Sequence, residues 1–401
     1  MVNNEHLAIW RQDTPGCAEW NHLNNAGSAL PPQSVTDAMV DYLSAESQRG
    51  GYELARERHH TISQFYSTLG SFLNVPASHI AYAYSATHAY ARALSCIPFE
   101  TGDVILTSTN DNVSNQLAFM SLKKRWGVNY VRVADQPAGG IDLEDLEDKI
   151  RTLHPRLVSV THVPTNSGLI QDVTGVGQLC QTYGIWYLLD ACQSVGQMPL
   201  DLPAIGCDFL CGTFRKFLRG PRGAGFLAVS DRVIKSALTP LFVDLQGADW
   251  DSLDGFTIKS SAIRFEEWER NYATVIGATA CLNYAERVGL TLIRERSFGL
   301  AAALRQKASE LPAVRILDHG PGLCAIVTLT LPSGPDGLLA HLQAERINAS
   351  LAPNTAAYMD MRRKQADWLL RLSPHYYNTE EEIEQVVDVL NIWLNKVIDE
   401  K

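Results

Sequence analysis

The sequence has no long hydrophobic run and carries less positive than negative charge. No stretch approaches the ~20 apolar residues of a membrane-spanning helix, and residues 1–16 lack the apolar core of a signal peptide. We therefore expect no membrane partner and a cytoplasmic location. Lys and Arg number 34 against 44 Asp and Glu, which gives a net charge of -10. This balance, without a basic stripe, argues against a nucleic-acid partner.

Patterns typical of metal sites and disulfides are also absent. The eight cysteines are scattered, and most stand in apolar, strand-like or helical contexts. Such cysteines are typically buried thiols in a reducing compartment. Cys207 and Cys211 are four residues apart, but no second pair or histidine cluster completes a zinc site. We therefore assign them to the core and expect no metal. No cysteine follows Cys324.

The composition is that of an ordinary globular protein with a large core, since 46% of the residues are apolar and 19% are charged. From residue 80, short apolar runs alternate with helical stretches, which predicts an α/β unit with a mostly parallel, seven-stranded sheet covered by helices. The strands are expected at residues 80–84, 104–107, 130–133, 157–163, 186–189, 209–211 and 225–229.

The alternation fades after residue 230. Helices are expected at 272–288, 290–311 and 380–397, with strands at 326–331 and 369–372. A chain of 401 residues suggests one large and one smaller unit. We therefore predict an N-terminal arm (1–30), a large domain (31–289) and a small C-terminal α+β domain (290–401).

Two strand ends carry the candidate chemistry. The run at 186–189 stops at Asp190, and the run at 209–211 is followed by Lys216, 26 positions after Asp190. Parallel strands present their carboxyl ends, and their ligand-binding loops, at one edge of the sheet. An acid and a lysine there predict a pyridoxal phosphate site, with Lys216 holding the cofactor as a Schiff base and Asp190 pairing with its pyridinium nitrogen. The alternatives are a solvated loop lysine and a strand-end cap.

A phosphate site is predicted where the first strand of the sheet ends. The strand leads into Ser85, Ala86, Thr87 and His88, small polar residues that open a helix. The free backbone N–H groups and the dipole of a helix N-terminus favour a phosphate. The alternative is ordinary turn and capping chemistry.

Four segments in order resemble a known family: residues 161–168 (THVPTNSG), 190–197 (DACQSVGQ), 213–225 (TFRKFLRGPRGAG) and 371–383 (RLSPHYYNTEEEI). They are similar to the class V aminotransferases, fold-type I pyridoxal phosphate enzymes that include the cysteine desulfurases. The resemblance runs from about residue 23 to residue 397. It implies the fold-type I architecture, an amino-acid substrate and a homodimer with the site at the interface.

The resemblance also assigns roles to individual residues. Asn112 stands at the position that stacks on the cofactor ring. Gln193 would contact the phenolic oxygen of the cofactor, with Thr165 or Asn166 nearby. Arg215 replaces the histidine that usually precedes the lysine. The implied phosphate ligands are Ala86, Thr87, Thr213 and Arg215. The alternatives are capping for Gln193 and turn roles for the asparagines and Thr165.

Two residues are candidates for substrate binding. Arg371 stands where the family places the arginine that holds the substrate α-carboxylate, a task that suits the two parallel bonds of a guanidinium. The alternative is a surface ion pair with residues 380–382. Tyr52, on a Gly-Gly-Tyr turn, either reaches a substrate pocket or belongs to the core.

The expected reaction follows from one departure from the family. Desulfurases carry a persulfide-forming cysteine on a loop shortly before the equivalent of Arg371, and this chain has none after Cys324. Two further segments, NNAG and RFEEWERN, together with RLSPHYYNTEEE, are similar to the subgroup of isopenicillin N epimerase-like proteins and the hercynylcysteine sulfoxide lyase of ergothioneine biosynthesis. The resemblance implies a carbon–sulfur β-lyase that cleaves a cysteine S-conjugate or sulfoxide to a thiol or sulfenic product, pyruvate and ammonia. The alternatives are an aminotransferase or amino-acid epimerase at the same site, and a non-catalytic cofactor-binding protein.

Overall fold

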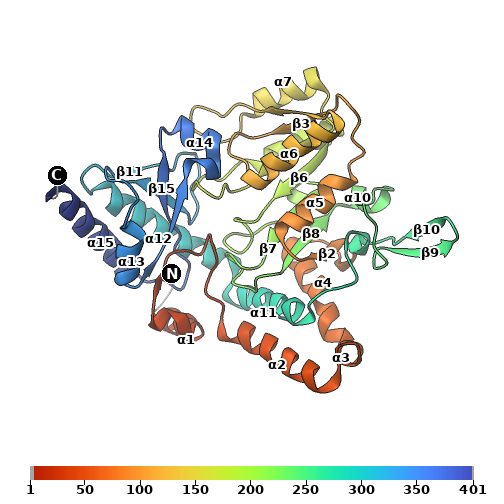
Figure 1. Ribbon diagram of the computed structural model, residues 1–401, viewed down its shortest axis with the longest axis horizontal. Helices are drawn as coiled ribbons and strands as arrows, with labels where there is room; N and C mark the ends of the chain where they lie inside the picture. Colours follow the sequence, from red (N-terminus) through yellow and green to blue (C-terminus); the bar gives the residue numbers. More distant parts are fainter. Residues whose placement is uncertain (1–3, 400–401) are drawn as a thin grey trace.

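A seven-stranded sheet organises the computed structural model, which describes residues 4–399 (Figure 1). Its strands are β2 (Ile80–Ala83), β3 (Val104–Thr107), β4 (Asn129–Arg132), β5 (Leu157–Thr161), β6 (Trp186–Asp190), β7 (Phe209–Thr213) and β8 (Gly225–Val229). Their order is β2-β8-β7-β6-β5-β3-β4, and β8 is the one strand that runs in the direction opposite to the other six. The predicted, mostly parallel sheet is confirmed. The first three residues of the predicted arm and the last two of the chain lie outside the description.

Both faces of this sheet are covered, which explains why its strands are apolar runs without alternation. Leu188 of β6 points into a core shared with α5 (Ala86–Cys96) and α6 (Val113–Trp126), whereas its neighbours Tyr187 and Leu189 join a larger core on the other face. That second core includes side chains of α8 (Val173–Tyr183) and α11 (Tyr272–Val288). The connection between β4 and β5 carries α7 (Leu143–Leu153).

The N-terminal helices lie below the large sheet in the view of Figure 1. The helix α2 (Gln33–Arg49) and the helix α4 (His59–Leu73) both pack against α11. The sequence predicts one continuous helix at about residues 53–72. The structure has α3 (Gly51–Glu57) and then α4, because the backbone leaves the helical region at Arg58 (φ -99°, ψ 19°).

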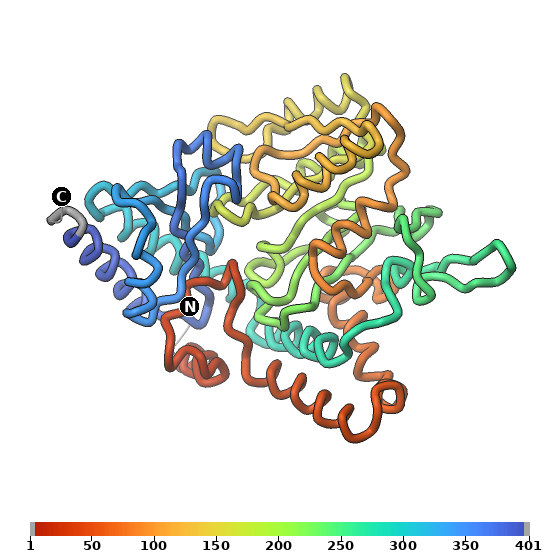
Figure 2. Tube along the Cα trace, viewed as in Figure 1, coloured from red at the N-terminus to blue at the C-terminus, as the bar shows by residue number. Residues whose placement is uncertain are grey.

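The C-terminal part contains a separate four-stranded antiparallel sheet. Its order is β11 (Arg315–Ile316), β12 (Val327–Thr330), β15 (Trp368–Leu372) and β14 (Ser350–Pro353). Two long helices, α12 (Leu290–Ser309) and α15 (Glu380–Asp399), pack against each other beside it. The N-terminal segment reaches this part, since β1 (Asn21–His22) pairs with β13 (Ile347–Asn348), and the red N-terminal segment runs beside the blue C-terminal strands in Figure 2.

The remaining elements are short. They are α1 (Asn4–Gln12), α9 (Leu202–Ile205), α10 (Asp231–Lys235), α13 (Leu338–Ala344), α14 (Tyr358–Arg363), the hairpin of β9 (Ala248–Ser252) and β10 (Gly255–Ile258), and the 3-10 turns at Pro15–Ala18, Ala77–His79, Ala262–Phe265 and Asn354–Ala357. Within residues 4–399, no helix is both long enough and apolar enough to span a bilayer. All eight cysteines fall in this range, and each is buried with a free thiol.

Candidate active site

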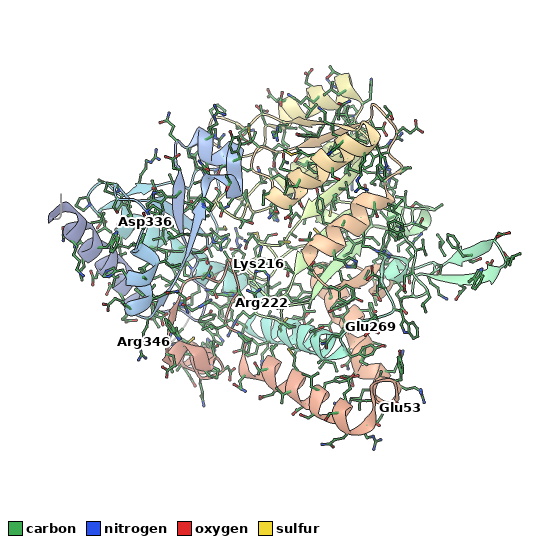
Figure 3. The ribbon with its side chains drawn as sticks, in the orientation of Figure 1. Glu53, Lys216, Arg222, Glu269, Asp336 and Arg346 are labelled. Atoms are coloured by element: carbon green, nitrogen blue, oxygen red, sulfur yellow. The ribbon has the colours of Figure 1, made fainter. Side chains whose placement is uncertain are left out.

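A cavity of about 180 Å³ lies at the carboxyl ends of β6 and β7, next to the start of α5. Figure 3 shows Lys216 near the centre of the molecule, between the large sheet and the C-terminal strands. Seven of the predicted cofactor residues line this cavity: Ala86, Thr87, Asn112, Asp190, Thr213, Arg215 and Lys216. The fold therefore brings together residues that are up to 130 positions apart, which is the separation of Ala86 and Lys216 (216 minus 86).

Asp190 is the last residue of β6 and is 5% exposed. Its Oδ1 accepts a hydrogen bond from the backbone N–H of Cys192 (2.9 Å), and its Oδ2 accepts one from Nδ2 of Asn115 (3.2 Å). The same Asn115 nitrogen donates to Oδ1 of Asp111 (2.9 Å). A single amide thus bridges two buried carboxylates, and burial raises the pKa of Asp111, with Asp190 adding to the rise.

Lys216 follows β7 and is 6% exposed. Burial is the main reason why the pKa of its amine is lowered, and the positive charges of Arg215 and Arg371 act in the same direction. Cys192 and Asp190 oppose the shift. A lysine with a lowered pKa has a larger neutral fraction, and the neutral amine is the form that acts as nucleophile or base.

The other end of the cavity is built for an anion. Ser85 caps α5 by accepting a hydrogen bond from the backbone N–H of His88 (3.1 Å), so the helix opens at Ala86 and Thr87. Thr213, the last residue of β7, and Arg215, in the loop after it, line the same cavity as this helix start. A helix N-terminus combined with a hydroxyl and a guanidinium is well suited to a phosphate.

A glycine allows this close approach of strand and helix. A Cβ at Gly225, the first residue of β8, would lie 2.5 Å from the carbonyl carbon of Ser85 and 2.7 Å from the nitrogen of Ala86. Both atoms belong to the backbone and have little freedom to move. The glycine at this position therefore fixes how near the helix start can lie to the sheet.

Arg371 comes from β15 of the smaller sheet. Its Nη1 donates to the carbonyl of Thr165 (3.1 Å) and its Nη2 to Oδ1 of Asn24 (3.3 Å), whereas its buried Nε has no partner among the described residues. Burial, and then the charge of Arg215, lowers the pKa of Arg371 to about 10. The guanidinium therefore stays protonated at neutral pH, and its Nε–H is unpaired. The alternative for Arg371, a surface ion pair with residues 380–382, is not seen among the described residues, where Glu380 pairs with Arg296 and Glu382 pairs with Arg11.

Asn112, Thr165 and Asn166 lie beside Arg371 and line a second cavity. Asn112 caps α6 by accepting from the backbone N–H of Ser114 (2.9 Å), and its Nδ2 donates to Oγ1 of Thr165 (3.4 Å). Asn166 donates to the carbonyl of Ala356 (3.3 Å). These turn contacts tie the large sheet to the segment before Arg371.

Two predicted residues line neither cavity. Gln193 is buried, with its Nε2 donating to the carbonyl of Ala26 (3.1 Å) and its Oε1 without a partner in the described chain. Tyr52 lies on α3 and is 65% exposed. The predicted turn at Tyr52 is wrong, since Gly51 and Tyr52 begin α3, and its exposure rules out the core alternative. The cofactor role of Gln193 and the substrate role of Tyr52 stay predictions. Asn115 and Asp111, in contrast, were missed, and the only signal was a run of amides and acids between residues 110 and 116.

These residues fit pyridoxal phosphate. The cavity offers a buried carboxylate for a ring nitrogen, a lysine amine for an aldehyde, and an anion-binding helix start with Thr213 and Arg215 for a phosphate. A group with those three functions matches the donor set of the cavity. The fold and this set of residues define a pyridoxal phosphate-dependent enzyme of fold type I, and its cofactor is pyridoxal 5'-phosphate.

The chain belongs to the class-V aminotransferase family, whose family model matches residues 21–386. A probable cysteine desulfurase of Methanothermobacter thermautotrophicus is 28% identical over 389 residues, covering 95% of this chain and 96% of the relative. The apo structure of a cysteine desulfurase from Thermococcus onnurineus has a TM-score of 0.89 at 25% identity and covers 99% of both chains. The cystine C–S lyase C-DES, at 22% identity, shares the fold with a TM-score of 0.84, covering 94% of this chain and 99% of that one.

Proposed function

We propose that the protein is a pyridoxal phosphate-dependent carbon–sulfur β-lyase that acts on cysteine S-conjugates or sulfoxides. The proposal rests on which functional residues of the family this chain has and which one it lacks. The chain keeps Lys216, Asp190 and Arg371, but it has no cysteine between Cys324 and its last residue. The residues needed to break bonds at Cα are therefore present, and the nucleophile that would take sulfur as a persulfide is missing.

The cofactor, when bound, supplies an acceptor for the electron pair that remains when a bond to Cα breaks. The other tasks fall to residues of this chain. Lys216 holds the cofactor and, once freed by the substrate amine, takes the proton from Cα. Asp190 keeps the ring nitrogen protonated, because a poorly solvated carboxylate raises the pKa of a partner cation. Ala86, Thr87, Thr213 and Arg215 hold the phosphate.

Arg371 binds the substrate α-carboxylate and thereby fixes which bond to Cα is aligned for cleavage. Its unpaired Nε and its lowered but still high pKa favour this task. In the proposed reaction the Cα–H and Cβ–S bonds break, and sulfur leaves with the electron pair of its bond, as a thiolate from a thioether conjugate and as a sulfenate from a sulfoxide. Water then hydrolyses the released enamine to pyruvate and ammonia. One conjugate and one water give one thiol, one pyruvate and one ammonia.

Two of the three similar proteins named above are cysteine desulfurases and the third is a C–S lyase, so the presence or absence of a sulfur acceptor decides between the two activities. In the segment before Arg371, a 3-10 turn at Asn354–Ala357 and the helix α14 carry no thiol. Cys324 is fully buried, and burial raises the pKa of its thiol to about 12. Cys192 is the one cysteine among the described residues that lines the cofactor cavity. We infer that it is packing and not a sulfur acceptor.

Three further proposals follow from the family resemblance. The protein belongs to the subgroup of isopenicillin N epimerase-like proteins and hercynylcysteine sulfoxide lyases, it forms a homodimer, and it acts in the cytoplasm. Eight buried, unpaired cysteines support a reducing compartment. Asn112 and Gln193 are proposed to contact the ring and its phenolic oxygen.

The test is a substrate panel of free cysteine, S-methyl-cysteine, S-benzyl-cysteine and its sulfoxide, each assayed for pyruvate and alanine together with the visible spectrum of the bound cofactor. We expect pyruvate from conjugates and no alanine. A Cys192→Ala variant should retain full activity, and a Lys216→Ala variant should lose it. Failure of every conjugate to yield pyruvate would sink the proposal, and loss of Cα deuterium with sulfur retained would favour an epimerase or aminotransferase instead.

A further inference from the structure

The second cavity, of about 410 Å³, adjoins the cofactor site and is given no role by the cofactor chemistry. Asn112 lines both cavities, and Arg371 lies at the edge of the larger one. A substrate whose carboxylate is held by Arg371 would therefore have its side chain close to the mouth of this cavity. A volume of this order is typical of sites that enclose a whole small molecule rather than a single thiol.

The walls of the cavity are mostly apolar. Val113, Leu117 and Met120 line it from successive turns of α6, and Tyr358 and Met359 line it from α14. All five side chains are exposed, so the cavity is open to solvent along them. The α14 side belongs to the segment that immediately precedes β15 and Arg371. This composition suits a bulky, largely apolar group.

The polar lining of the cavity is incompletely paired. Asn110 is 4% exposed, yet neither its amide oxygen nor its amide nitrogen has a hydrogen-bond partner among the described residues. Nε of Arg132 is buried without a partner as well, although its Nη2 donates to Oε1 of Gln116 (2.8 Å). A buried amide normally finds partners, so an orphaned donor and acceptor in one cavity wall indicate a bound group that supplies both.

We propose that this cavity binds the sulfur substituent of the substrate. The substituent would be bulky and largely apolar, and it would carry a carboxamide-type group that accepts from Asn110 or Arg132 and donates to Asn110. This inference depends on the proposed lyase reaction, because it names the substrate class of that same site. It identifies Asn110 and Met120 as residues that determine specificity.

The test compares three conjugates on the wild-type holoenzyme: S-methyl-cysteine, S-benzyl-cysteine and S-(4-carbamoylbenzyl)-cysteine. Two quantities are measured for each, namely kcat/KM for pyruvate release and a dissociation constant from the first change in the cofactor spectrum on rapid mixing. We expect both aryl conjugates to bind more tightly than the methyl conjugate, and the carbamoyl group to add roughly tenfold or more.

Two variants locate the effect. Met120→Trp should weaken binding of both aryl conjugates by roughly tenfold or more by filling the cavity, whereas Asn110→Leu should remove only the advantage of the carbamoyl group. Ser121→Trp, one residue further on α6 and exposed, is the matched control and should change neither.

Equal binding of all three conjugates, or equal effects of Met120→Trp and Ser121→Trp, would overturn the subsite. The dissociation constants report on the subsite even where no pyruvate forms. Absence of pyruvate would therefore count against the lyase reaction, and absence of the size preference against the subsite.

Discussion

At Lys216, burial and two arginines act together on one amine. Burial lowers its pKa most, and Arg215 and Arg371 add to the effect, while Cys192 and Asp190 oppose it. The charge of Arg215 therefore has two proposed functions, since it faces the phosphate end of the cavity and also favours a neutral Lys216. A histidine at that position, as in the family pattern, would carry a positive charge only when its ring is protonated, whereas Arg215 carries one at any neutral pH.

The first prediction concerns this charge. Arg215→Gln should raise the pKa of Lys216, because it removes a like charge while the burial of the amine is unchanged. The amine then becomes neutral only at higher pH, so the acidic limb of the pH profile of kcat should shift to higher pH, by about one pH unit or less. The profile should be recorded at saturating cofactor, since the phosphate contact also weakens. A limb that stays in place or moves to lower pH contradicts this role.

The second prediction concerns substrate binding. Arg371→Lys keeps the positive charge but loses the planar pair of donors, so KM should rise by roughly tenfold or more with a smaller loss in kcat. The visible spectrum of the bound cofactor should be unchanged. Equal KM values for the variant and the wild type would show that Arg371 does not hold the carboxylate.

At the scale of the elements, the sequence predicted the sheet better than the site. Six of the seven strands were found because each is a short apolar run of mostly buried side chains, and β3 and β8 match their expected bounds. The edge strand β4 (Asn129–Arg132) is only partly buried, and it starts one residue before its expected bounds. The break at Arg58 was missed because no glycine or proline marks it. Asp111 and Asn115 were missed because their relation to Asp190 exists only after α6 packs beside β6.

The third prediction tests the packing of β8 against α5. Gly225→Ala places a methyl group within 3 Å of the Ser85 and Ala86 backbone, so the helix start must shift. We expect weaker cofactor binding and a loss of about 1–3 kcal/mol in the free energy of unfolding. Gly299→Ala in α12, which has open space around it, is the control and should be neutral or stabilising by up to about 1 kcal/mol. Equal cofactor affinity in the two variants would contradict the close-approach argument.

At the scale of the whole molecule, the predicted domain limits stay a prediction. Gly289 separates α11 from α12 with φ 91°, a conformation that favours glycine, and this supports a boundary between residues 289 and 290. The predicted arm is less independent than its name suggests, because it pairs with β13 and contributes Asn24 to the contacts of Arg371.

The fourth prediction concerns assembly. The hairpin of β9 and β10 projects from the molecule in Figure 2, and its residues Trp250, Leu253 and Phe256 are 81%, 86% and 57% exposed. Apolar side chains gathered on a projection are typical of an interaction surface. We expect a dimer in light-scattering measurements after size exclusion. The dimer of a Trp250→Asp, Phe256→Asp double variant should dissociate at a higher protein concentration than the wild-type dimer. A monomeric wild type at micromolar concentration contradicts the dimer.

The central claim is that this family member releases sulfur by elimination and not by transfer to a cysteine. The most direct test is the product balance from S-benzyl-cysteine, with thiol, pyruvate, ammonia and alanine all quantified. The account predicts thiol, pyruvate and ammonia in equal amounts, no alanine, and no products with Lys216→Ala. Intact conjugate, or alanine as the carbon product, would contradict it.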